Sequence, residues 1–221
     1  MAKDFWETKA FNQWSKKEYE KILNDSPWAK ELNLTGVNEI FTGAAAATDG
    51  RPPYIKYKIL LRSAAPVRQA IVRKEQINNQ YDSLPADQKL AFDQSTENFL
   101  NDTSPELVIV SISFETNNLD YLCDLNRHWE IQSTDLLKNS VYLSASKGEK
   151  VPILQFIPGN SASQEFQFIF PREVNGKEIL QPGGKTLQLE FAYPVIDELG
   201  DGRGFIEFKT DKMKINNKVV Y

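Results

Sequence analysis

The sequence has a single cysteine, Cys123, and a single histidine, His128, among its 221 residues. One cysteine excludes an intramolecular disulfide and a zinc site built from several cysteines. Serine and cysteine nucleophiles of the triad type need a histidine as base, so any such site would depend on His128. The two lie five positions apart, which on a helix places them about 140° apart around the axis. We interpret them as a buried thiol and a surface or half-buried imidazole.

Long apolar runs are missing as well. No stretch of 18 apolar residues occurs, so the sequence predicts no membrane span. The first residues also lack the apolar stretch of a secretory signal. Basic residues number 26 and acidic residues 30, which gives a formal net charge of −4 without any long basic run. A nucleic-acid binder usually needs a positive stripe, so we expect no nucleic-acid partner.

Motifs for cofactors and metals are equally scarce. Neither the phosphate loop G-x-x-x-x-G-K-[ST] nor the dinucleotide turn G-x-G-x-x-G occurs. The segment 197–203 superficially resembles a calcium loop, but Leu199 stands where an oxygen-bearing side chain is needed, and no glutamate closes the loop. We therefore expect an ordinary acidic turn there, no bound metal and no cofactor.

Aromatic residues are abundant: 13 phenylalanines and 8 tyrosines favour a β-rich core. Beyond residue 140, apolar and polar side chains alternate with the period of two that is typical of strands. Asn175-Gly176 and Pro182-Gly183-Gly184 are typical of turns. Short strands with such turns suggest a sandwich. We expect strands at 141–146, 152–157, 165–171, 186–193, 204–210 and 213–221, the last folded into a hairpin at Asn216-Asn217.

Helices and two further strands are expected in the first 140 residues. Ser15 and Glu18 form a capping box that starts one helix, and Ser26-Pro27 would start another. A nearly continuous β-branched run after Pro105 predicts a central, buried strand. The expected elements are strands at 54–61 and 107–114, a helical pair at 65–101 between them, and a short helix from 119 to about 126.

These elements together predict an α+β fold: an antiparallel β-sandwich-like C-terminal half with N-terminal helices and an inserted helical pair. We expect residues 1–42 to form a helical segment packed on the main domain, and residues 54–221 to form a single folding unit. Between them, residues 43–53 contain four alanines, Asp-Gly and two prolines, which predicts an exposed, mobile loop.

Three of the four tryptophans, Trp6, Trp14 and Trp28, lie within the first 28 residues. Exposed aromatic side chains often anchor partners, so these three are our candidate partner-binding residues. The alternative is that the N-terminal helices use the three rings to dock on the sandwich. The fourth ring, Trp129, we assign to the core.

Three stretches of the sequence are distinctive in combination. They are residues 14–30, which contain Ser26-Pro27-Trp28-Ala29, residues 63–70, and residues 212–221. Their order and spacing resemble an uncharacterised family of bacterial exported proteins, in which a short helical motif containing Ser-Pro-Trp-Ala leads into an α+β domain. The resemblance implies a periplasmic or extracellular location and no catalytic residue. Such relatives begin with a signal sequence that this chain lacks, so a cytoplasmic location stays open.

Three functions follow from these observations. We predict a non-catalytic binding or scaffold module of the cell envelope or exterior, which engages a protein or glycan through a sheet face, the loop 43–53 or the N-terminal aromatics. The first alternative is a glycosidase-like hydrolase, which needs two facing carboxyl groups, one with a raised pKa. The second is a carrier of small apolar ligands, which needs a large internal cavity.

Overall fold

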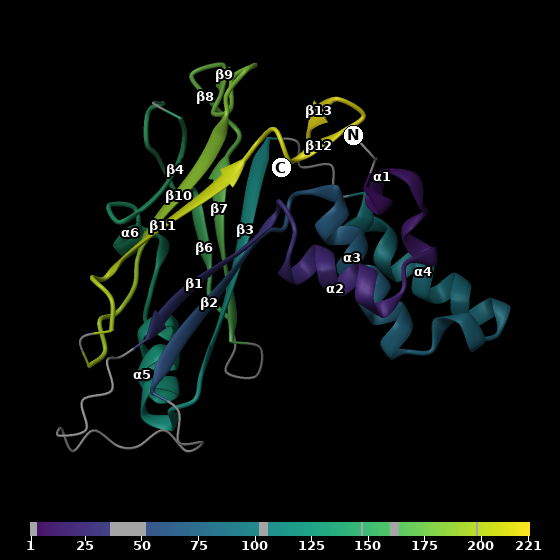
Figure 1. The fold of residues 1–221 in the computed structure, drawn as a ribbon, viewed down its shortest axis with the longest axis horizontal. Coiled ribbons are helices and arrows are strands. Elements are labelled where there is room, and N and C mark those ends of the chain that lie inside the picture. The colour runs from purple at the N-terminus through teal and green to yellow at the C-terminus, as the bar shows by residue number, and fades with distance from the viewer. Residues whose placement is uncertain (1–3, 36–51, 102–105, 147, 160–163, 198) are drawn as a thin grey trace.

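Two antiparallel sheets face each other and form the body of the molecule, and the N-terminal helices and the helices inserted between β2 and β3 lie on one side of it (Figure 1). The computed structural model describes residues 4–35, 52–101, 106–146, 148–159, 164–197 and 199–221. The five-stranded sheet has the order β1 (Ala29–Thr35), β2 (Tyr54–Leu61), β3 (Leu107–Thr116), β7 (Glu165–Pro171) and β6 (Gln155–Ile157). The four-stranded sheet has the order β11 (Arg203–Lys209), β10 (Thr186–Ala192), β4 (Val141–Ala145) and β5 (Val151–Pro152). The predicted α+β class is confirmed.

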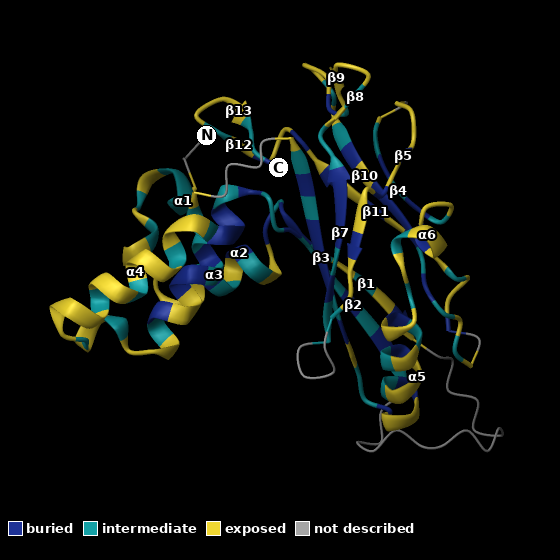
Figure 2. Cartoon of the chain, turned by 180° about the vertical axis from the view of Figure 1, so that it is seen from behind, coloured by how far each residue is buried: buried dark blue, intermediate teal, exposed yellow. Residues whose placement is uncertain are grey.

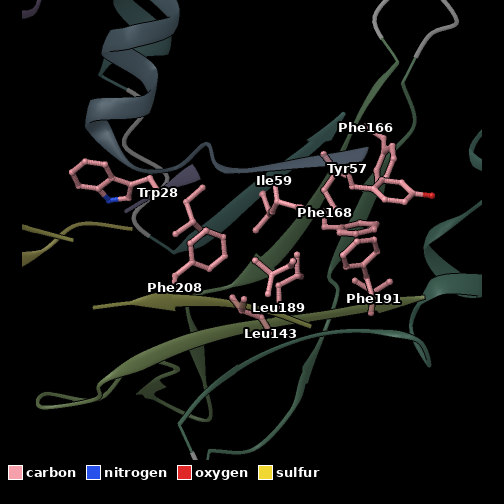
Figure 3. Packing of buried hydrophobic residues seen from close by; sticks show 14 of the residues in the cluster. Trp28, Tyr57, Ile59, Leu143, Phe166, Phe168, Leu189, Phe191 and Phe208 are labelled. Carbon is pink, nitrogen blue, oxygen red and sulfur yellow. The ribbon is translucent and has the colours of Figure 1, made fainter. Parts of the chain in front are cut away.

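The core lies between the two sheets, where the alternating apolar side chains of both meet (Figure 3). Tyr57 from β2 and Phe191 from β10 make an edge-to-face contact with ring centroids 5.9 Å apart. Phe168 from β7 also reaches Phe191 across the gap, at 6.2 Å. All three side chains are fully buried, so the period-two pattern serves to close this interior from water.

The strand β1 was not predicted, because residues 26–28 were expected to start a helix. Ser26 instead ends α2 (Lys16–Asn24) and turns the chain: its Oγ donates to the Ile22 carbonyl at 2.6 Å and accepts from the Trp28 amide at 3.3 Å. The next seven residues pair with β2 along its whole length. The prediction of a helix that starts at Ser26-Pro27 is therefore wrong, because strand pairing overrides a weak local helix signal.

The helical layer combines the N-terminal segment with the helices inserted between β2 and β3. Both members of the predicted capping box, Ser15 and Glu18, make their reciprocal hydrogen bonds. The buried Arg73 joins three parts of the layer, because its guanidinium donates to the Trp14 carbonyl at 2.7 Å and contacts Asp82 at 3.3 Å. The remaining elements are α1 (Phe5–Thr8), η1 (Phe11–Gln13), α3 (Ala65–Asn78), η2 (Tyr81–Ser83) and α4 (Ala86–Leu100).

Two more helices, α5 (Leu119–Glu130) and α6 (Thr134–Leu137), lie against the sandwich, with α5 at its lower end in Figure 1. The Trp129 ring stacks on Phe166 at 4.0 Å, which confirms its assignment to the core. Thr134 Oγ1 accepts the Phe156 amide of the edge strand β6 at 3.0 Å. This bond partly covers an edge that would otherwise leave backbone donors unpaired.

The last residues of the chain lie between the sandwich and the helices. The predicted hairpin is confirmed: β12 (Lys214–Ile215) and β13 (Lys218–Val219) are joined by Asn216 and Asn217, both with positive φ. Trp28 Nε1 then donates to the Val220 carbonyl at 2.7 Å. Arg172 donates to the Tyr221 carbonyl at 2.7 Å, and its guanidinium lies 4.1 Å from the centre of that ring. The C-terminal segment thus connects the two sheets to the N-terminal segment.

Two other predictions concern mobile and membrane-spanning segments. Residues 43–51 of the predicted loop lie outside the described residues. Among the helices that the structure describes, none is both long enough and apolar enough to cross a bilayer. The Asn175-Gly176 turn is described, and it joins β8 (Glu173–Val174) to β9 (Lys177–Glu178) as expected.

Candidate functional site

The three tryptophans proposed as partner-binding residues lie together, but two of them are not accessible. Trp14 and Trp28 are 1% and 0% exposed, so neither ring can meet a partner on the surface of this structure. Trp6 is half-buried and meets the Trp28 ring edge-on at 5.6 Å. Trp14 and Trp28 therefore pack inside the structure, and Trp6 is the one of the three that keeps a solvent-accessible part. The physical reason is that large rings contribute most when they leave water completely.

The Cys123 and His128 pair also differs from the prediction. Cys123 is exposed on α5 rather than buried, because it lies on the helix face turned away from Tyr121, Leu125 and Trp129. The His128 ring is half-buried, and this burial lowers its pKa. Gln132 Nε2 is 3.4 Å from His128 Nε2. No contact joins the thiol to the imidazole in the described chain, so the pair does not form a dyad.

A sheet face that none of the described helices covers offers a better candidate. We use the name open face for the outward side chains of the four-stranded sheet, which alternate with the buried ones on β4, β10 and β11. The buried members of β11 are Gly204, Ile206 and Phe208, and the residues between them are exposed. The open face comprises Tyr142, Ser144, Gln188, Glu190, Arg203, Phe205 and Glu207.

Glu190 lies at the centre of the open face and has two cationic partners. The register places it directly between Tyr142 of β4 and Phe205 of β11. Its side chain is only 10% exposed; Lys150 Nζ donates to Oε2, and Arg203 Nη1 donates to Oε1 at 3.3 Å. Lys150 also lies 5.4 Å above the Tyr142 ring. A carboxylate fixed from two sides keeps one orientation, which is the property of a pre-organised binding group.

Phe205 stands beside this carboxylate and is 55% exposed. It is the one large apolar side chain of the open face that is mainly accessible to solvent. The exposed Phe205 ring can stack on a flat apolar surface of a ligand, while the neighbouring carboxylate and the two cations bind polar groups at the edges of that ligand. The sequence contained the signal, because Phe205 occupies a polar position in the alternation of 203–209. Sequence reasoning missed it by counting phenylalanines as core.

A groove continues from one end of the open face. Its volume is about 720 Å³, and we call it the lysine groove; six of its lining residues are Lys185, Thr186, Glu207, Lys209, Asp211 and Lys214. One wall is the turn at Gly183, whose φ of +86° requires glycine, and Thr210 Oγ1 donates to the Gly184 carbonyl at 2.6 Å. The hairpin of β12 and β13 forms the other wall.

The hydrolase alternative depends on a carboxyl group with a raised pKa. Shifted carboxyl groups of the described chain are Glu18, Asp135 and Asp201, and each has a lowered pKa. The causes are hydrogen bonds from Lys9, from Lys138 and from the Arg203 amide respectively. A general acid needs the opposite shift, so these three give the hydrolase no support. In the described ranges, no three histidine, cysteine or acidic side chains gather where they could hold a metal ion.

The carrier alternative depends on an internal cavity. The space between the sheets is filled by the packed rings of Tyr57, Phe168 and Phe191 (Figure 3). The pocket next to Trp129 and Phe166 has a volume of about 10 Å³, far below the several hundred Å³ of a small-molecule site. The interior therefore gives no support to a carrier.

Comparisons with known proteins found no significant match. No family model matches the chain, no curated protein is significantly similar to it, and no solved structure matches its fold significantly.

Proposed function

We propose that this protein is a non-catalytic binding module that holds a glycan on the open face. The observation that carries the proposal is the exposed Phe205 ring beside Glu190, which is buried and held by Lys150 and Arg203. The ring offers a flat apolar surface for the C–H face of a sugar, and the fixed charged groups offer partners for its hydroxyls.

The polarity of the open face favours a glycan over a protein partner. Stable protein interfaces have a core that is largely apolar and contains several large side chains. Phe205 is the one mainly exposed large apolar side chain on the open face, and Gln188, Glu207 and Arg203 around it are polar and exposed. Such a face suits a ligand that is itself polar with small apolar patches.

The location outside the cytoplasm is part of the same proposal. Its support is the resemblance of the Ser26-Pro27-Trp28-Ala29 motif and its companion stretches to exported bacterial proteins. A binding module that works in the envelope or outside the cell would meet glycans there, so the location and the ligand class agree.

The experiment is a glycan array with three forms of the purified chain. We expect the native chain to bind at least one neutral or acidic glycan class, and Phe205→Ala to lose that binding. Leu90→Ala is the matched control, because Leu90 is similarly exposed, at 59%, but lies on α4 away from the open face. The proposal fails if no glycan class is retained, or if both variants bind like the native chain.

A further inference from the structure

The lysine groove and the open face are one continuous surface. Thr186 and Lys209 are register partners on the outward side, as are Gln188 and Glu207, and the row of Glu190 and Phe205 follows. Thr186, Glu207 and Lys209 also line the groove. A chain-like ligand that lies on Phe205 can therefore extend along β10 and β11 into the groove without leaving the surface.

Three cations of the groove have no acidic partner among the residues that the structure describes. Lys185, Lys209 and Lys214 are exposed and form no ion pair with any residue that the structure describes. The groove between the helical layer and the five-stranded sheet, of about 420 Å³, differs in this respect. There, the acids Glu20, Glu75 and Glu165 line the groove together with its cations, and Arg62 pairs with Glu165 at 3.0 Å. A cation that already pairs with an acid of the protein binds an anionic ligand less strongly. The lysine groove is therefore the stronger candidate of the two grooves for an anion site.

The segments around the lysine groove carry a net positive charge, whereas the whole chain carries a net negative charge. Residues 182–186 and 207–219 contain five lysines and two acids, whereas the chain carries a formal charge of −4. Glu207 and Asp211 stand among these lysines, so the positive charge is interrupted. A densely charged polyanion such as a nucleic acid would be repelled at those positions. A ligand whose negative charges are spaced along a polar chain fits the pattern better.

We propose that the lysine groove binds the carboxylate groups of an acidic glycan whose neighbouring sugars stack on the open face. This inference rests on the proposed function and names the ligand class. The walls are fixed by Gly183 with Thr210 and by the Asn216-Asn217 turn, so the lysines project from a pre-organised frame. Binding of this kind weakens as salt rises, because exposed ion pairs are screened.

The test uses hyaluronan oligosaccharides, whose carboxylates alternate with neutral sugars, and the same oligosaccharides with their carboxyl groups reduced to alcohols. We expect the native chain to bind the acidic form more tightly by calorimetry, and the preference to shrink at high salt. Lys185→Gln, Lys209→Gln and Lys214→Gln combined should weaken acidic binding about tenfold, which is about 1.4 kcal/mol in total, because each exposed ion pair contributes little. Binding of the reduced form should not change.

The control variant removes the same net charge elsewhere, through Lys17→Gln, Lys21→Gln and Lys74→Gln on α2 and α3. An equal loss in this control would overturn the inference, because only net charge would matter. Equal affinity for both oligosaccharides would also overturn it and leave glycan binding by the open face intact. A poly-glutamate peptide that bound as tightly, through the same lysines, would overturn it in favour of an acidic protein partner. Failure of every glycan, together with an inert Phe205→Ala, would reject the proposed function itself.

Discussion

Strand β7 and helix α4 bury very different shares of their side chains. In β7, Phe166, Phe168 and Phe170 are all closed to solvent and face the opposite sheet. In α4, which has 15 residues, no residue is buried, and Figure 2 shows it in the colours of exposed and intermediate residues. Burial of apolar area is the main favourable term in folding, so the free energy of unfolding is concentrated in the sandwich.

The two sides of the four-stranded sheet differ in the same way: one side is buried in the core, and the other carries the proposed binding surface. The four-stranded sheet buries Leu187, Leu189 and Phe191 on one side and presents the open face on the other. A ligand on the open face would therefore rest on a sheet whose other side is buried in the core. A rigid support of this kind keeps binding groups in place, and α4 would give no such support.

Among substitutions that compare the sandwich with α4, the largest change in the free energy of unfolding is expected at Phe168. Phe168→Ala should lower the free energy of unfolding by about 3–5 kcal/mol, because it leaves a cavity between the sheets. Phe92→Ala on α4 should cost only about 1 kcal/mol, since that ring is half-buried. Urea unfolding of both variants measures the difference. Similar losses would contradict the contrast between the two regions.

A smaller effect on the free energy of unfolding is expected where the C-terminal segment is bound to the sandwich. Arg172→Met removes hydrogen bonds to the Leu107 and Tyr221 carbonyls, made at 3.1 and 2.7 Å, and should cost about 2–3 kcal/mol. Lys177→Met on the exposed turn of β9 is the control and should change stability by less than about 0.5 kcal/mol. If Arg172→Met unfolded like the control, the bonds from Arg172 to the C-terminal segment would not contribute to stability.

A smaller effect on the free energy of unfolding is expected at Glu18 in the helical layer, and it should depend on pH. Hydrogen bonds from Lys9 and from the Ser15 amide lower the pKa of Glu18 from 4.5 to about 2. A lowered pKa stabilises the fold above pH 4.5, and this contribution is lost as the pH falls toward 2. Glu18→Gln should therefore cost about 1 kcal/mol at pH 7 and little at pH 2, measured by urea unfolding at both. A loss independent of pH would show that the charge is not responsible; Glu20→Gln is the exposed control.

The smallest effect is expected on the surface of α4. Leu90→Ala should change the free energy of unfolding by less than about 0.5 kcal/mol, because Leu90 is 59% exposed. Leu125→Ala on α5, where the side chain is fully buried, should cost about 2–5 kcal/mol in the same assay. A large loss for Leu90→Ala would show that α4 has apolar contacts that its exposure does not reveal.

Several elements were predictable because their signals are local. The capping box of Ser15 and Glu18, the Asn175-Gly176 turn and the strand at 165–171 all appear at the predicted residues. Each depends on neighbours within a few positions, so no distant contact is needed to specify it. The helical pair between β2 and β3 was predictable for the same reason.

The candidate site could not be predicted from local signals in the sequence. The exposure of Phe205 depends on how the described elements are arranged around β10 and β11, and the burial of Trp28 depends on Val220, 192 positions away. The lysine groove needs the Gly183 turn and the C-terminal hairpin to meet in space. Strand β1 likewise forms because β2 offers a complete row of partners. None of these contacts is encoded within a short window.

The sequence by itself determined the class of fold and the scarcity of catalytic groups, because composition, capping and period-two alternation act locally. Only the tertiary structure decided which aromatic rings are accessible, which edge strand joins the five-stranded sheet, and which lysines are left without acids. These depend on contacts between residues far apart in the chain. Their energies arise from burial and pairing that exist only once the two sheets have met.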